Sequence, residues 1–128
     1  MQENCTFDYA TIRVVPRVER EEFINVGVIL SCPAKKFLKA KIELNEERLK
    51  AFAPSIDIQA IRHYLDIIPK ICEGSDEAGT IGKLTQRERF YWLTATRSTI
   101  IQSSPIHTGF AVNAEEMLEK LMNKMVRN

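Results

Sequence analysis

The chain has 128 residues, of which 45% are hydrophobic and 27% are charged. This length and balance predict one folded domain over residues 1–128 and exclude a disordered chain, which would be less apolar. Eighteen Lys and Arg residues oppose 17 Asp and Glu residues, and the resulting net charge of +1 produces no overall field that attracts nucleic acid or an anionic membrane.

Targeting signals and cysteine usage indicate the compartment. Residues 1–5 lack the basic-then-apolar pattern of a secretion signal, and no apolar run approaches the ~20 residues that cross a bilayer. The three cysteines, Cys5, Cys32 and Cys72, lie far apart and are odd in number, which argues against a disulfide framework. We therefore expect a cytoplasmic protein without a membrane segment, in which Cys32 and Cys72 are buried, inert thiols.

Three stretches in the first third of the chain alternate apolar and polar residues. This period of two predicts half-buried strands at residues 7–15, 23–32 and 37–44, and Pro16 and Pro33 follow the first two. In the second strand one buried face is expected to hold Ile24, Val26, Val28, Leu30 and Cys32. The three strands together predict an antiparallel meander.

Helical signals follow. Asn45 is a good N-cap for a short helix that ends before Pro54. A longer helix is expected from Asp57, and Pro69 should kink or end it because proline lacks a backbone donor. Residues 73–82 contain three glycines and are expected to form a surface loop.

The last third of the chain combines two helices with one strand. Thr85 begins a capping-box sequence, and the aromatic run in the helix after it is expected to anchor that helix to the core. Residues 97–103 predict a fourth strand, followed by a turn at Ser104 and Pro105 and a polar loop to residue 109. Asn113 opens a final amphipathic helix.

These elements predict an α+β fold. We expect an antiparallel sheet of about four strands with helices packed mainly on one face, namely the helix from Asp57 and the C-terminal helix.

Four motifs carry a resemblance to a known family. They occupy residues 12–16, 22–30, 87–95 and 97–109, and the last is the most specific. Together they resemble the bacterial domain of unknown function 3037 family over almost the whole chain. The resemblance implies a bacterial cytoplasmic protein of a family without an established activity. Genes of this family often lie beside a gene for a HipA-like kinase, which suggests a kinase-like protein as partner.

The densest polar cluster lies between residues 97 and 108, which we expect to be the functional surface. Its hydroxyl, amide and cationic groups are of the kinds that hold phosphate or carboxylate. Arg13 and Asn25 would join the cluster if the fourth strand pairs alongside the first. A small-ligand or nucleotide site would then use Arg13, Asn25, Arg97, Ser98, Gln102 and His107. The alternative is a turn whose side chains bond only to nearby backbone, with Arg13 in an ion pair with Asp8 or Glu22.

Nucleophilic catalysis, metal binding and nucleic-acid binding find little support in the sequence. Ser104 and His107 lack the context of a nucleophilic pair, and His63 and His107 lack ligand spacing, so we expect no catalytic residue, metal or cofactor. Gly27 indicates a bulge, close packing or the approach of a ligand. The lysines of the third strand are expected on its solvent face, where they protect the sheet or, less favourably, bind nucleic acid.

Three functions therefore stay open. The first is a non-enzymatic accessory or protein-interaction domain, the second is a small-ligand or nucleotide-binding domain, and the third is a nucleic-acid binder, which the neutral net charge disfavours. The sequence does not determine the oligomeric state.

Overall fold

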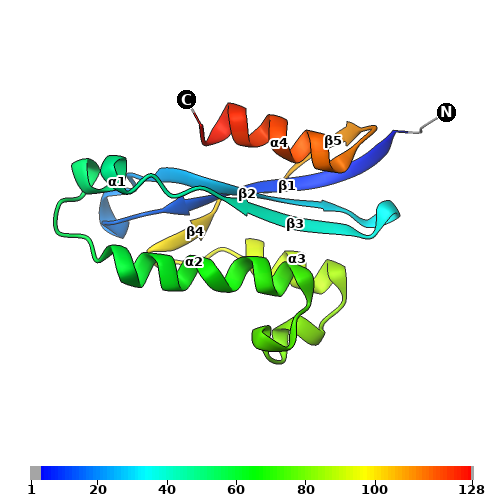
Figure 1. The fold of residues 1–128 in the computed structure, drawn as a ribbon, viewed down its shortest axis with the longest axis horizontal. Helices are drawn as coiled ribbons and strands as arrows, with labels where there is room; N and C mark the ends of the chain where they lie inside the picture. The colour runs from blue at the N-terminus through cyan, green and yellow to red at the C-terminus, as the bar shows by residue number, and fades with distance from the viewer. Residues whose placement is uncertain (1–3, 128) are drawn as a thin grey trace.

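The computed structural model describes residues 4–127. Residues 1–3 lie outside the described residues. They are part of the N-terminal segment in which no secretion signal was expected. The strands are β1 (Cys5–Val14), β2 (Ile24–Cys32), β3 (Phe37–Ile42), β4 (Ile101–Ser103) and β5 (His107–Ala111). The helices are α1 (Glu46–Phe52), α2 (Ile58–Glu73), α3 (Gln86–Thr94) and α4 (Ala114–Met125). Figure 1 shows helices on both sides of one sheet.

The sheet is antiparallel, which confirms the predicted α+β class. Its order is β3-β2-β1-β4, and β5 also pairs with β1. β4 pairs with the second half of β1, and β5 pairs with the first half on the same edge.

β5 was not expected, because residues 107–109 were interpreted as a polar loop. Between β4 and β5, the backbone N–H of Ser104 donates to Thr11 O at 2.9 Å. The Ser104 side chain in turn accepts from Thr11 N at 2.9 Å. A serine hydroxyl therefore bridges a break in the edge strand and leaves the Thr11 amide satisfied.

A β-bulge divides β2. Ile12 pairs with Gly27, whereas Arg13 pairs with Asn25, so that Val26 is the extra residue. Since one inserted residue moves all later side chains to the other face of a strand, β2 buries apolar residues on both sides. Ile24 and Val26 belong to the apolar cluster under α2, whereas Val28, Leu30 and Cys32 belong to the cluster under α4. All five are buried as predicted, but the expectation that they share one face is wrong.

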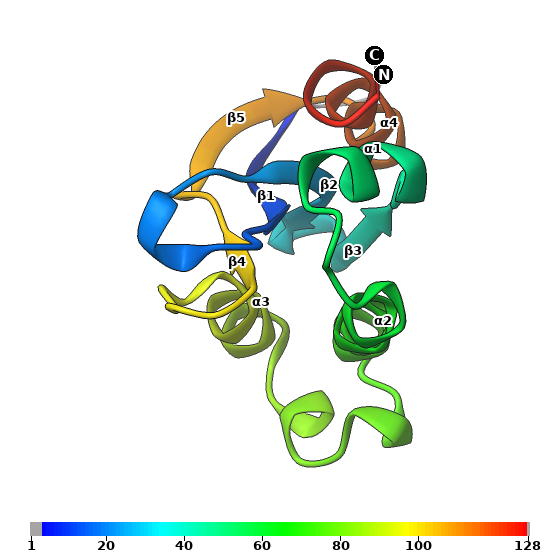
Figure 2. The same ribbon diagram turned by 90° about the vertical axis from the view of Figure 1, so that its left-hand side faces the viewer.

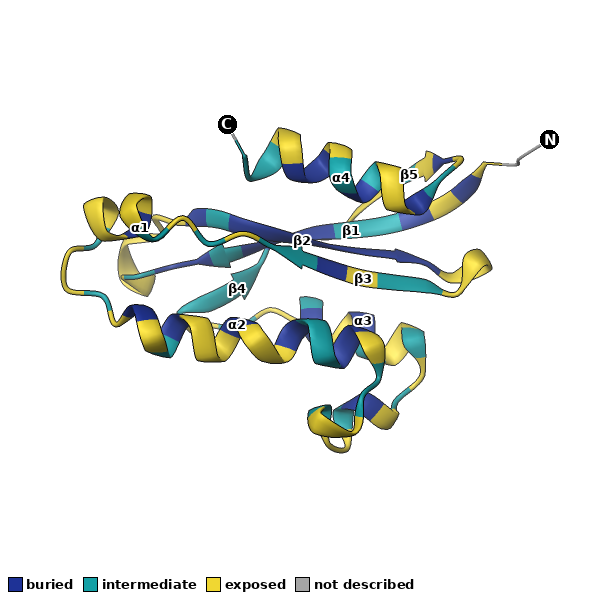
Figure 3. Cartoon of the chain, viewed as in Figure 1, coloured by how far each residue is buried: buried dark blue, intermediate teal, exposed yellow. Residues whose placement is uncertain are grey.

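The helices cover both faces of the sheet. α2 and α3 lie on one face and α4 lies on the other (Figures 1 and 2). Two of the three helices that pack on the sheet share one face, in line with the predicted arrangement, but the expectation that the C-terminal helix lies beside α2 is wrong. α4 packs instead against the second apolar face that the bulge creates, where its Leu118 and Met122 are fully buried. Figure 3 shows the buried stripes of α2 and α4 turned toward the sheet.

Local signals set the helix ends. The side chains of Asn45, Asp57 and Asn113 each accept from the backbone N–H three residues ahead, and Thr85 forms a complete capping box with Glu88.

Pro69 does not end α2. The helix continues to Glu73 and stops at Gly74, which has a φ of 69°. Arg89 of α3 donates to the carbonyls of Ile71 and Cys72 at 2.9 and 2.5 Å, which satisfies the C-terminal end of α2 and ties the two helices together there.

Candidate binding groove

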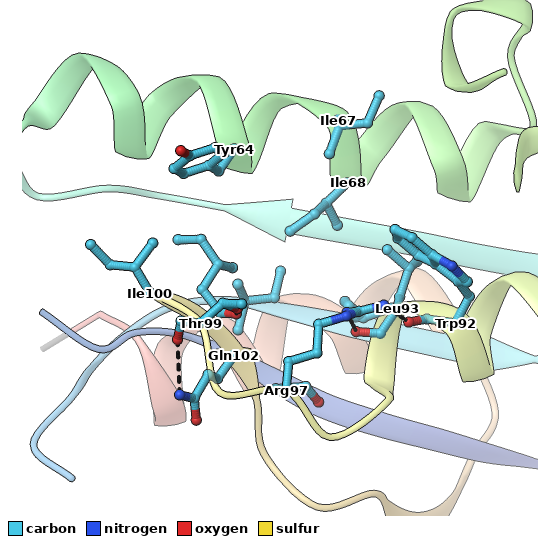
Figure 4. A pocket seen from close by; sticks show the side chains of 13 residues that line it. Tyr64, Ile67, Ile68, Trp92, Leu93, Arg97, Thr99, Ile100 and Gln102 are labelled. Carbon is cyan, nitrogen blue, oxygen red and sulfur yellow. Dashed lines mark hydrogen bonds between the residues drawn. The ribbon is translucent and has the colours of Figure 1, made fainter. Parts of the chain in front are cut away.

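The face covered by α2 and α3 contains a hollow of about 390 Å³. Ile12 and Ile29 of the sheet form its floor, α2 and α3 form its walls, and residues 99–103 close one side. Figure 4 shows Tyr64 and Ile68 of α2 opposite Trp92 and Leu93 of α3. We call this hollow the α2–α3 groove.

The walls follow from helix periodicity. Ile61, Leu65 and Ile68 form the buried stripe of α2, and Tyr64 and Ile67 lie beside that stripe, with exposed fractions of 51% and 37%. In α3 the side chain of Leu93 is buried, whereas its neighbour Trp92 is 40% exposed. Large apolar side chains therefore face water inside a concave site.

The aromatic run of α3 is only partly a core anchor. Phe90 is buried, but Tyr91 and Trp92 are exposed, so the prediction that the aromatic run anchors α3 holds for Phe90 alone. Three consecutive residues span about 200° of helix, and one helix face cannot bury all of them.

Arg97 forms the cationic part of the groove rim. Its guanidinium lies over the Trp92 ring, with Cζ 4.4 Å from the ring centroid. It also donates to the carbonyls of Leu93, at 3.4 Å, and Trp92. These bonds satisfy carbonyls at the end of α3, and a guanidinium with five N–H donors keeps further donors for another acceptor.

The rest of the rim is polar but internally bonded. Gln102 Nε2 donates to Thr99 O at 2.8 Å, as the dashed line in Figure 4 shows, and Thr99 Oγ1 donates to Ile101 O at 2.7 Å. Farther along the chain, Ser103 and Ser104 bond to neighbouring carbonyls, and Thr108 Oγ1 donates to Asp8 at 2.6 Å. Most hydroxyls between residues 97 and 108 therefore serve the local backbone, as the capped-turn interpretation expects.

The six residues of the predicted ligand site occupy different places. Arg97 and Gln102 line the groove. Ser98 is exposed outside its lining, and His107 lies in β5, with its ring centroid 5.2 Å from that of Tyr9. Arg13 and Asn25 lie on the opposite, α4-covered side of the sheet, where Asn25 Nδ2 donates to the carbonyl of Met125 at 3.2 Å.

β4 pairs alongside β1, and this pairing brings three of the six into one row. Arg13 is paired with Asn25 on one side and Gln102 on the other. The Arg13 guanidinium lies 4.0 Å from the Phe23 ring centroid, and burial lowers the pKa of Arg13 without removing its charge. Arg13 Nε and Asn25 Oδ1 are both buried without a hydrogen-bond partner among residues 4–127.

Neither acid that was considered as a partner of Arg13 is paired with it. Glu22 forms an ion pair with Arg20 at 2.6 Å, and Asp8 accepts from Thr108. The stacking on Phe23 replaces the expected ion pair.

The lysines of β3 do not form a free solvent face. Lys39 and Lys41 form ion pairs with Glu115 and Glu119 of α4 at 2.9 and 2.5 Å. The expectation of a solvent face holds only in part, because the Lys39 and Lys41 side chains are 50% and 36% exposed but α4 lies along the side of the sheet to which they point. Their charges are matched within the fold, which weakens the case for a nucleic-acid surface.

Residues 4–127 lack two features. No group of three or more His, Cys, Asp or Glu side chains in this part of the chain is placed to hold a metal ion. None of the helices over the same residues is long and apolar enough to span a membrane.

The groove itself was not predicted. Its signals were the width of the apolar stripe of α2, which includes Tyr64 and Ile67, and the aromatic run of α3. Neither signal distinguishes a core contact from an exposed wall until the separation of the two helices is known.

Comparison with known proteins assigns the chain to a family. Residues 9–126 match the family described as protein of unknown function (DUF3037). The chain belongs to this family. No curated protein and no solved structure matches it significantly. The DUF3037 match includes every residue that lines the α2–α3 groove.

Proposed function

We propose that this DUF3037 protein is a non-enzymatic interaction domain that binds a partner protein through the α2–α3 groove. The observation that carries the proposal is the presence of Tyr64, Ile67 and Trp92, all substantially exposed, around one hollow. Exposed apolar side chains in a concave site favour an apolar occupant, because burying them removes their contact with water. Aromatic side chains in such sites commonly supply much of the binding energy.

Positive charge at the groove rim favours a partner segment that carries an acidic side chain. Arg97 lies at the mouth of the groove, and Arg87 lies 5.5 Å from the Tyr91 ring centroid on the exposed side of α3. A segment with aliphatic or aromatic anchors and a nearby acidic side chain complements this surface. Its carboxylate would accept from the donors of Arg97 that do not bond to α3.

A HipA-like kinase is the partner that we propose, in a bacterial cytoplasm. This choice rests on the family resemblance, in which genes for such kinases are frequent neighbours. The apolar lining of the groove and the charge of Arg97 support a docking segment on that kinase that combines apolar anchors with an acidic side chain.

Trp92 is the only tryptophan of the chain, and its fluorescence is therefore a direct probe of the groove. Titration with a purified HipA-like kinase should shift Trp92 emission and protect it from acrylamide quenching. Ile67→Glu should weaken binding about tenfold or more, equivalent to about 1.4 kcal/mol. The matched control is Phe110→Ala, because Phe110 of β5 is 71% exposed and lies outside the groove lining. Equal affinity of both variants, or no binding, would contradict the proposal.

The size of the groove favours a second candidate, a small apolar ligand with an anionic group near Arg97. A volume of about 390 Å³ lies in the range of small-molecule sites. Native mass spectrometry of the purified protein distinguishes the two, because a small ligand should appear as a stoichiometric added mass that Ile67→Glu removes. A protein without added mass that binds the kinase supports the first function.

A further inference from the structure

Two of the three cysteines meet in the fold. Cys5 begins β1 and Cys32 ends β2, and their exposed fractions are 7% and 0%. Their Sγ atoms lie 2.7 Å apart, and the thiol of Cys32 donates to the sulfur of Cys5. This distance is shorter than the ~3.5–4.0 Å at which unbonded carbon atoms ordinarily make contact. It is only about 0.7 Å longer than a disulfide bond.

The strand register brings the two thiols together. Asp8 pairs with Ser31, so continuation of the antiparallel register places Phe7 opposite Cys32 and Cys5 one diagonal step away on the same face. Both cysteines belong to the apolar cluster under α4, and the backbone of Cys5 also pairs with Ala111 of β5. Packing from the sheet and from α4 therefore holds the pair.

We infer that Cys5 and Cys32 are an oxidation site, at which a peroxide converts the two thiols into an intramolecular disulfide. The sulfur of one cysteine attacks a peroxide oxygen, which gives a sulfenic acid and releases water. The second sulfur then attacks the sulfenic sulfur, the S–S bond forms, and the hydroxyl group leaves with a proton as water. In total, two thiols lose two protons and two electrons, and one hydrogen peroxide is reduced to two waters.

The environment assigns the order of the two steps. Burial, followed by the hydrogen bond to Cys5, raises the pKa of the Cys32 thiol. Because the thiolate is the reactive form and Cys32 is fully covered, Cys32 is the poorer first nucleophile. Cys5 therefore reacts with the peroxide, and Cys32 resolves the sulfenic acid. A small oxidant suits the site, because Cys5 is only 7% exposed and Cys32 is fully covered.

The bond would join the two ends of the β1–β2 unit, across 27 positions of sequence. The same corner is already tied to the start of α4, because Lys35 Nζ, in the turn after β2, donates to the carbonyl of Val112 at 2.8 Å. A disulfide here restricts the unfolded chain and should make the native protein more resistant to denaturant. This effect is independent of the α2–α3 groove, which lies on the other face of the sheet.

Cys72 provides an internal control. It lies in the other apolar cluster, on α2, and burial raises the pKa of its thiol to about 12. Neither of the other two cysteines belongs to that cluster. Cys72 is therefore expected to remain a thiol while the pair reacts.

The test uses the reduced full-length chain and hydrogen peroxide. The three thiols, counted with a thiol reagent in denaturant, should fall to one, and the intact mass should fall by about 2 Da as two hydrogens are lost. Peptide mapping without reductant should join the Cys5 peptide to the Cys32 peptide. The urea midpoint should rise, and dithiothreitol should reverse the rise. Cys72→Ser should retain the same bond and the same shift of midpoint.

Cys5→Ser and Cys32→Ser should each abolish the bond and the midpoint shift. If either variant does not fold, the peptide map of the wild-type chain still decides. Three thiols that persist in the folded chain, at a peroxide concentration that oxidises the chain in denaturant, would overturn the inference. A bond that involves Cys72 would overturn it equally.

Discussion

The guanidinium of Arg97 stacks on the indole of Trp92 while it donates to the carbonyl that Trp92 contributes to the end of α3. One residue therefore caps the helix, fixes the orientation of an aromatic wall and places a positive charge at the groove mouth. Its structural and binding roles can be separated because stability and Trp92 emission are measured without a partner, whereas affinity requires one.

Arg97→Ala should reduce the free energy of unfolding by about 1–2 kcal/mol, since the variant loses a cation–π contact and two bonds to carbonyls. Trp92 emission should change in the same variant. His107→Ala is the comparison, because His107 is exposed and loses only its contact with the Tyr9 ring, so its effect should stay below about 1 kcal/mol. Urea unfolding measures the stability of both variants, and fluorescence measures their Trp92 emission. Weaker binding by Arg97→Ala with unchanged stability and emission would show that Arg97 acts only as a ligand contact.

Val28→Ala should destabilise the protein by about 1–3 kcal/mol, because Val28 is fully buried between β2 and α4 and its loss leaves a cavity. The urea midpoint should fall while the slope of the transition stays constant. An unchanged midpoint would mean that this part of β2 is not packed under α4.

Gly27→Ala tests why glycine occupies the bulge. A Cβ at Gly27 would lie 2.6 Å from the carbonyl oxygen of Lys41, and 3.1 Å from side-chain atoms of Ile12 and Ile42. The backbone of β3 would have to move, so we expect a loss of about 2–3 kcal/mol. Gly79→Ala provides the comparison, because a Cβ there meets nothing within 4 Å among the described residues, so that any loss comes from the backbone, which has a φ of 65° and a ψ of −144°. Its cost should be about 1–3 kcal/mol, since glycine alone adopts this conformation readily. Gly27→Ala without a loss of stability would contradict the close approach.

The ion-pair cluster at Glu119 should make stability dependent on pH. Hydrogen bonds from Arg127 and Lys41 lower the pKa of Glu119 to about 2, and Arg127 also lowers the pKa of Glu43. A depressed folded-state pKa stabilises the protein above the unfolded value, which is about 4.3 for Glu. That contribution is lost as the pH falls from about 4.5 toward 2.

Glu119→Gln should accordingly lower the melting temperature at pH 7, and the difference from the wild type should narrow near pH 2. Glu19→Gln is the matched control, since Glu19 is exposed and has no ion pair among the described residues. Added salt should also reduce the difference at pH 7, because these charges lie at the surface. A difference that is constant from pH 7 to pH 2 would exclude the charge of Glu119 as its cause.

The helix starts and the first three strands could be predicted from the sequence. Asn45, Asp57, Thr85 and Asn113 mark helix starts because a cap bonds to backbone only three residues away. The first three strands could be located because alternating side chains are a property of the strand itself. These signals depend on neighbours in the chain and need no knowledge of the rest of the molecule.

Tertiary structure decided the face of the sheet to which each side chain points. The single extra residue at Val26 places Ile24 and Val26 under α2 but Val28, Leu30 and Cys32 under α4, and it sets Asn25 beside Arg13 on the side of the sheet away from the groove. Composition carries no signal of such a register shift, because it arises from pairing with a distant strand. The contact between the Cys5 and Cys32 thiols and the opening between α2 and α3 also depend on packing between distant segments. Each joins residues that are far apart in sequence, so only the packed chain determines their distance.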